Sequence, residues 1–146
     1  MPSRVVSLRV SQEQAERLQR KARQLGRSPS ETGAILLDES LRKEEFAFID
    51  FRDSAVGRQA CIQGSRLAVW QVVSLVRSYD GDVNKTAEHL QWPAVKVLAA
   101  LNYAKAFPEE IENALSDNRS YDFEKISKIL PQAEHFGGPA TPRKRK

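Results

Sequence analysis

The stretch that decides the fold is RVVSLRV, residues 4–10. In an extended chain successive side chains point to opposite sides, so a period of two in polarity is typical of a half-buried β-strand. Two sets of three side chains then lie on opposite faces: Val6, Leu8 and Val10 on one, and Val5, Ser7 and Arg9 on the other. The pattern therefore predicts one short strand with a buried side and a free side.

Two amphipathic helices are predicted directly after this strand. Ser11 is a fitting N-cap for the first helix, and Gly26 is typical of its C-terminal end. Ser30 is the expected N-cap of a second helix that runs to about Glu45. The apolar side of this second helix is formed by Ala34, Leu37 and Leu41, widened by Ile35 and Leu36.

One strand and two helices in residues 1–45 are too few to bury a stable core alone. An isolated strand also leaves a row of backbone N–H and C=O groups unpaired. Both difficulties disappear if two chains pair their strands antiparallel and pack their four helices together. We therefore expect a homodimer.

Residues 1–45 resemble the ribbon-helix-helix family of the Arc and MetJ type. The residues that carry the resemblance are VVSLRVSQEQAERLQRKARQLGRSPSE and the helix that follows them. The matching features are the alternating strand, the small polar residue before the first helix, the Leu-Gly end and the serine that opens the second helix. The resemblance implies a two-stranded ribbon, one strand from each chain, inserted into the major groove of DNA.

This resemblance also implies which side chains contact DNA. The guanidinium of Arg9 can pair bidentately with guanine, and Val5 can touch a thymine methyl group. The implied base contacts are Val5, Ser7 and Arg9, and the implied phosphate contacts, near the free amides of the second helix, are Arg27, Ser28 and Ser30. The alternative is that the module only dimerises and that Arg9 is a solvated surface charge.

The pattern changes after residue 45, and residues 46–118 predict a second domain with short strands and small helices. The stretch GRQACIQGSRLAV (57–69) is expected to form small strands or a loose hairpin that turns at Gln63–Gly64. Four helices are expected after it: Trp70–Tyr79, a short helix capped by Asp82 and ending near Leu90, one from Pro93 to about Phe107, and one from Pro108.

Residues 49–115 resemble a small bacterial helix-turn-helix family, the domain of unknown function numbered four-three-three. The resemblance rests on GRQACIQGSRLAV, TAEHLQWPAVKVLAALNYA and FPEEI. Members are widespread as antitoxin-like, VapB-like partners encoded beside PIN-like ribonuclease toxins, which implies that this chain neutralises such a toxin. Residues 86–90 and 94–103 are either a second DNA-reading unit or, as their apolar side chains favour, core or interface.

Residues 119–146 are expected to be a partner-binding tail that is partly disordered when free. A polar stretch after Asn118 separates the preceding helix from a short amphipathic segment. The candidate toxin contacts are apolar side chains at spacings suited to binding in a groove: Tyr121, Phe123, Ile126, Ile129, Leu130 and Phe136. The alternative is that residues 121–130 pack back on the second domain. Residues 143–146 (RKRK) are either a nonspecific phosphate contact or a solvated end.

Charge and composition support a polyanion-binding end and exclude several other classes. The net charge is +4, made up of +2 in residues 1–45, −2 in 46–118 and +4 in 119–146. The apolar runs are too short for a membrane span, and one cysteine, Cys61, fits a reducing compartment, so we expect a cytoplasmic protein. We find no catalytic residues, no metal ligands and no cofactor motif, and we expect no enzyme.

The sequence therefore predicts a mainly α protein: a ribbon-helix-helix dimerisation module followed by a small helical, helix-turn-helix-like domain with short strands. The expected function is that of a type II antitoxin. As a homodimer it would bind double-stranded operator DNA to repress its own synthesis, and it would neutralise a PIN-like ribonuclease by direct binding. The alternatives are a stand-alone repressor or plasmid-maintenance regulator without a toxin, and an adaptor with no affinity for DNA.

Overall fold

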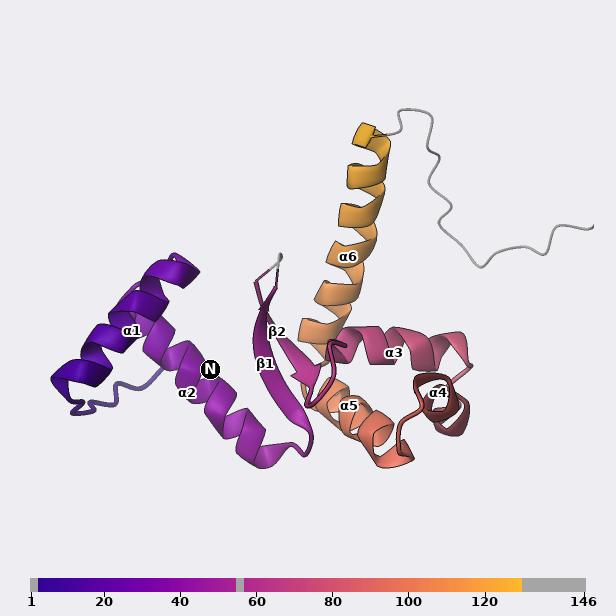
Figure 1. Ribbon diagram of the computed structural model, residues 1–146, viewed down its shortest axis with the longest axis horizontal. Coiled ribbons are helices and arrows are strands. Elements are labelled where there is room, and N and C mark those ends of the chain that lie inside the picture. The colour runs from indigo at the N-terminus through magenta and orange to yellow at the C-terminus, as the bar shows by residue number, and fades with distance from the viewer. Residues whose placement is uncertain (1–2, 55–56, 130–146) are drawn as a thin grey trace, which may run out of the picture.

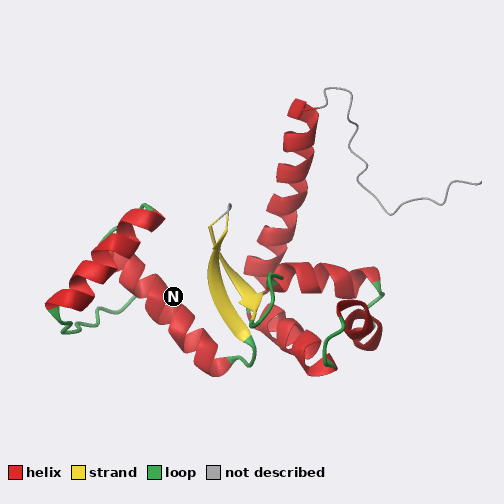
Figure 2. Cartoon of the chain, viewed as in Figure 1, coloured by secondary structure: helices red, strands yellow, loops and turns green. Residues whose placement is uncertain are grey.

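A computed structural model of the chain describes residues 3–54 and 57–129, the last ten of them by their backbone only. Within these residues the chain forms six α-helices and one two-stranded antiparallel sheet (Figures 1 and 2). The prediction of a mainly α protein with short strands is confirmed. Helices α1 and α2 lie on one side of the sheet and α3, α4 and α5 on the other, while α6 projects away from them.

The strand predicted at residues 4–10 is not formed in the single chain. Residues 3–11 are extended but pair with no other described segment, and all of their side chains are exposed. The physical reason is that a β-strand is defined by hydrogen bonds to a neighbouring strand, and the one sheet among the described residues contains only β1 and β2. The prediction of a strand therefore depends on a second chain.

The two N-terminal helices are capped by their own sequence. In α1 (Gln12–Leu25) the Oγ of Ser11 accepts the N–H of Gln14, and the side chain of Gln14 accepts the N–H of Ser11 in return, at 3.1 and 3.0 Å. Gly26 ends α1 with a φ of 64°, as predicted. Helix α2 (Pro29–Glu45) corrects one prediction, because its N-cap is Ser28 and not Ser30. Pro29 favours this earlier start, since its fixed φ and missing N–H suit the first helical position.

The antiparallel hairpin joins β1 (Ile49–Ser54) to β2 (Gly57–Ile62), with Ile49 opposite Ile62 and Ser54 opposite Gly57. The predicted turn at Gln63–Gly64 does form as a loose hairpin, in which the N–H of Ile62 donates to the carbonyl of Leu67 at 3.0 Å, although the paired strands β1 and β2 are connected earlier, through residues 55–56. In this turn Gly64 has a φ of 77° and a single bridge pairs Cys61 with Ala68. Because β1 (Ile49–Ser54) pairs with β2, the Gly64 turn leads from β2 into α3.

The core lies between the hairpin and the helices α3 (Val69–Ser78), α4 (Val83–Leu90) and α5 (Ala94–Ala106). Asp82 caps α4, as predicted, with its carboxylate accepting the N–H of Lys85. Pro93 is the N-cap residue of α5 and not its first helical residue. Side chains of every element from β1 to α6 meet in this core, including Ile49, Ile62, Val69, Val72, Val76, Ala87, Val97, Tyr103, Ile111 and Leu115.

Helix α6 (Pro108–Ile129) is one continuous helix of 22 residues. The predicted polar break after Asn118 is wrong, because no proline or glycine interrupts residues 109–129 and polar residues are compatible with a solvated helix. The predicted limit between residues 118 and 119 therefore falls inside this helix. Among the described residues, none of the helices combines the length and the apolar character that crossing a bilayer requires.

Candidate functional site

The predicted base-contacting side chains lie in the extended segment before α1. Val5, Ser7 and Arg9 are all exposed, Val5 to 96%. No hydrogen bond or ion pair joins any of the three to another described residue, so their polar groups are available to a ligand. Within one chain nothing fixes how they are presented.

The predicted phosphate contacts lie together where α2 begins. The Oγ of Ser28 accepts the N–H of Glu31 at 3.1 Å, so this hydroxyl serves the helix cap. The guanidinium of Arg27 is 3.6 Å from the carboxylate of Glu31, and both side chains are more than half exposed. Ser30 is exposed in the first turn. The structure thus groups Arg27, Ser28 and Ser30, and gives Ser28 a structural role that the sequence prediction had given to Ser30.

The N-terminal module carries an uncovered apolar surface. Val6 and Leu8 are each 72% exposed, and on α2 Leu37 is 48% and Leu41 52% exposed. By contrast, the side chains of Ala22 on α1 and Thr32 in the first half of α2 are buried. Several exposed large apolar side chains in one module are typical of an interface.

Of the six predicted toxin contacts, four lie among the described residues. Residues Tyr121, Phe123, Ile126 and Ile129 lie on the last two turns of α6, of which the backbone alone is described. Leu130 and Phe136 lie outside the described residues. These six residues therefore remain predictions.

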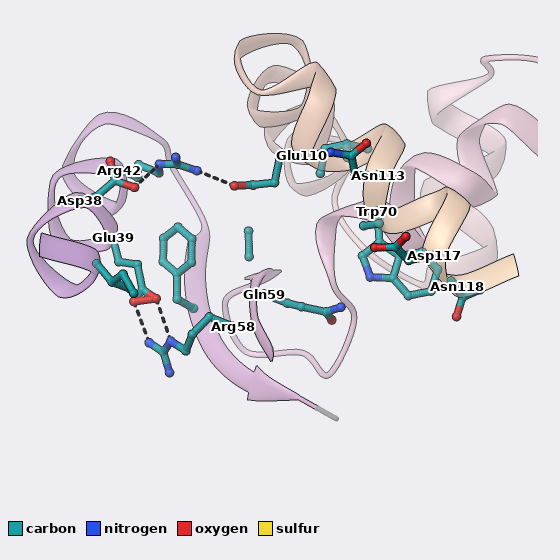
Figure 3. Close-up of a pocket in the computed structure, with 15 residues that line it drawn as sticks. Asp38, Glu39, Arg42, Arg58, Gln59, Trp70, Glu110, Asn113, Asp117 and Asn118 are labelled. Atoms are coloured by element: carbon teal, nitrogen blue, oxygen red, sulfur yellow. Dashed lines mark hydrogen bonds and ion pairs between the residues drawn. The ribbon is translucent and has the colours of Figure 1, made fainter. Parts of the chain in front are cut away.

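A groove that the sequence did not predict lies between α2, the hairpin, α3 and α6 (Figure 3). Its volume is about 400 Å³. Ion pairs occupy the end near α2, whereas Trp70, Asp117 and Asn118 lie together at the other end. The lining side chains come from five elements spread over residues 35–118, so no local spacing in the sequence could have revealed them.

Arg42 is the centre of the first group of ion pairs. Its guanidinium donates to the hydroxyl of Tyr103 at 2.6 Å and to the carboxylate of Glu110 at 2.9 Å, and it lies 3.7 Å from the ring centre of Phe107. The Tyr103 hydroxyl in turn donates to the other oxygen of Glu110 at 2.5 Å. Burial, and then the bond to Glu110, raise the pKa of Tyr103 well above its ordinary value. The group links α2 to α5 and α6.

Arg58 is the centre of the second group. It binds the nearly buried carboxylate of Glu39 through two hydrogen bonds of 2.7 and 2.8 Å, a bidentate pair that joins β2 to α2. Arg58 also donates to Asp53 at 3.1 Å, and Asp53 accepts from Lys21 of α1 at 2.9 Å. The bond from Lys21, followed by that from Arg58, lowers the pKa of Asp53 below its ordinary value.

Five polar groups that line the groove have no hydrogen-bond partner among the described residues. The buried indole N–H of Trp70 is one of them. The other four are the side chains of Gln59, Asn113, Asp117 and Asn118. In the part of the chain that is described, no three His, Cys, Asp or Glu side chains gather as metal ligands do. The five unpartnered groups are free to form hydrogen bonds with a ligand.

Comparison with known proteins adds no assignment: no protein-family model, curated protein or solved structure matches this chain. The two resemblances described above therefore remain expectations drawn from the quoted residues.

Tyr103 gives a test of the Arg42 group. Because its folded-state pKa is raised above 10.0, its contribution to stability is complete below pH 10 and is lost as the pH rises further. We expect Tyr103→Phe to cost about 1–2 kcal/mol at pH 7 and to weaken the loss of stability above pH 10. Urea unfolding at both pH values measures this.

The matched control is Tyr79→Phe, since the Tyr79 hydroxyl bonds to His89 at the surface at 2.7 Å. That change should stay within about 0.5 kcal/mol of the wild type. If the wild type and Tyr103→Phe lose stability in parallel above pH 10, Tyr103 does not keep its proton in the folded chain.

Proposed function

We propose that this chain is a DNA-binding regulator of the ribbon-helix-helix type that acts as a homodimer. The observations that carry the proposal are the exposed apolar side chains of residues 6–10 and of α2, and the backbone of the extended residues 3–10, which has no hydrogen-bond partner among the described residues. Pairing the segments of two chains antiparallel satisfies this backbone and covers the surface in one step.

The size of the apolar surface fits a dimer interface. Val6, Leu8, Val10, Leu37 and Leu41 are each at least half exposed or close to it. Burying such a side chain contributes about 1 kcal/mol or more, so ten of them in a dimer contribute on the order of 10 kcal/mol. This is comparable to the cost of associating two chains, about 4–15 kcal/mol. The apolar surface alone is thus of the right order to hold two copies together.

Antiparallel pairing also gives the other face of the ribbon a function. Covering Val6, Leu8 and Val10 leaves Val5, Ser7 and Arg9 on the outer face, because side chains alternate along a strand. A two-stranded ribbon fits the major groove, where Arg9 is suited to guanine. The positive end of α2, with Arg27 and Ser30, would then contact the phosphates beside the groove.

The proposal extends to an antitoxin, in which the second domain and α6 bind a PIN-like ribonuclease. Its support is the resemblance of residues 49–115 to antitoxin-like proteins, together with a long helix that projects from the core (Figure 1). Phe123, Ile126 and Ile129 follow each other at intervals of three residues along this helix. Such spacing places them along one side of it, as in helices that bind in a groove.

Dimerisation is tested by matched substitutions on the two faces of the predicted ribbon. We expect Leu8→Asn, on the inner face, to shift the protein from dimer to monomer in sedimentation equilibrium at micromolar concentration. Ser7→Asn, on the outer face, should leave the dimer intact, because it covers no apolar surface. A wild type that is monomeric at these concentrations contradicts the proposal.

DNA binding is tested with the fragment upstream of the chain's own coding region. We expect Arg9→Ala to weaken binding at least about tenfold in a gel shift, because one bidentate contact to guanine contributes about 1–3 kcal/mol. Arg20→Ala on α1 removes the same charge from an exposed position and should have a much smaller effect. Equal binding by wild type and Arg9→Ala would argue against readout by the ribbon.

Neutralisation is tested with the product of the adjacent reading frame. If that frame encodes a small PIN-like ribonuclease, we expect the full chain to inhibit it. Replacing Phe123, Ile126 and Ile129 by serine should relieve inhibition while DNA binding stays unchanged. Alanine at Glu124, Lys125 and Ser127 is the control. Full inhibition by the serine variant would remove α6 from the toxin interface, and the absence of a toxin gene would favour the stand-alone repressor.

A further inference from the structure

The groove beside α6 has the form of a peptide-binding site. Part of its lining is apolar, contributed by α2, both strands and α6: Ile35, Phe51, Ala60, Ile111 and Ala114. Trp70 adds an aromatic ring and a buried, unpartnered indole N–H at the end away from the ion pairs of α2 (Figure 3). Pockets that combine an apolar lining with a few convergent polar groups are the usual form of a binding site.

The unpartnered polar groups suit an extended backbone. An extended segment presents both N–H and C=O groups that no helix or sheet has satisfied. The amides of Gln59, Asn113 and Asn118 can pair with either group, and the indole N–H of Trp70 can donate to a carbonyl. A proline-containing segment fits best, because proline stays extended and docks against aromatic rings.

The charge of the groove favours a basic occupant. Four carboxylates line it, those of Asp38, Glu39, Glu110 and Asp117, against the two guanidinium groups of Arg42 and Arg58. Glu39 is held by Arg58, and Glu110 by Arg42. The carboxylate of Asp38 also pairs with the guanidinium of Arg42, at 3.0 Å. The carboxylate of Asp117 has no ionic partner among the described residues. The lining therefore carries a surplus of two negative charges.

The chain contains one segment with this chemistry. Residues 137–146 read GGPATPRKRK, with two prolines followed by four basic residues. They come after α6, whose residues 113–118 form a wall of the groove. Ile129 lies eleven residues beyond Asn118, or about 16 Å along the helix axis. Residues 130–142 in extended form span about 40 Å, which is enough to return to the groove.

We propose that this groove binds an extended, proline-containing, basic peptide segment, and that its occupant in the free protein is residues 137–146 of the same chain. Trp70 contacts the prolines, and Asp38 and Asp117 attract the basic residues. The bound segment is unable to contact DNA phosphates or another protein at the same time, so the groove controls when these charges are available. This inference does not depend on dimerisation or on DNA binding.

Zero-length carbodiimide cross-linking of the full chain tests the proposal, since it joins a lysine amine to a carboxylate in direct contact. Lys144 and Lys146 are expected to link to Asp38 and Asp117, and mass spectrometry identifies the linked peptides. Raising the ionic strength from about 0.05 to about 0.5 M should reduce the yield several-fold. Mixing isotopically labelled and unlabelled protein distinguishes links within a chain from links between copies, and links only between copies overturn the assignment to the same chain.

Matched variants of the full chain complete the test. Asp117→Asn should lower the cross-links from the tail to Asp38 at least about threefold, because a charge partner is lost. Glu88→Gln, at an exposed position of α4 outside the groove, should leave them unchanged. Equal yields from the tail to Glu88, Glu13 and the groove carboxylates overturn the proposal.

A second experiment measures the NMR signal of Trp70 in the groove. Replacing residues 143–146 by serine should move the NMR signal of the Trp70 indole N–H and speed its exchange with water, while the signal of Trp92, outside the groove, stays in place. Unchanged Trp70 signals overturn the proposal, and circular dichroism confirms that each variant is folded.

Discussion

The arrangement of this protein depends on two arginines that hold helix α2 against the second domain. Arg58 binds Glu39 from the hairpin, and Arg42 reaches Tyr103 and Glu110 on α5 and α6. The bonds from Arg58 to Glu39 and from Arg42 to Tyr103 are partly buried, so solvent screens them less than it screens surface pairs. They position α2, and α2 belongs to both parts of the molecule.

The two sides of α2 serve different purposes. Ile35, Asp38, Glu39 and Arg42 recur at helical spacing and face the groove. Ala34, Leu37 and Leu41 lie on another side of the helix and are exposed. A second copy that covers the exposed side would leave the groove open, so the proposed dimer and the proposed peptide site do not compete for the same surface. Because α2 contributes side chains to both surfaces, a partner chain or a bound peptide contacts the same helix.

The proposals also distribute charge in a consistent way. The extended N-terminal segment and the start of α2 carry arginines suited to a polyanion, whereas the groove carries a surplus of carboxylates. A basic segment of the chain can therefore be attracted either to phosphate or to the groove. Both interactions weaken with salt, and geometry decides between them: the groove adds an aromatic ring and amides that a phosphate backbone does not offer.

The sequence by itself determined the local structure wherever short-range chemistry is sufficient. Ser11, Gly26 and Asp82 set helix ends through bonds to backbone groups a few residues away, and the helical periodicity located α1 to α5. The sequence did not locate the start of α2 correctly, because Ser28 and Ser30, on either side of Pro29, are both suitable N-cap residues. The sequence did not show that β2 pairs with β1, because one strand has several possible partners, whereas the turn at Gly64 forms where it was predicted.

Only the tertiary structure decided which distant residues meet. Glu39 and Arg58, or Arg42 and Glu110, are ordinary charges in the sequence, and their pairing follows from how α2 packs on the hairpin and α6. The groove likewise exists because five elements meet around it. The N-terminal segment is the opposite case: its alternating pattern is plain in the sequence, but a strand requires hydrogen bonds from a neighbour, and a single chain does not provide one.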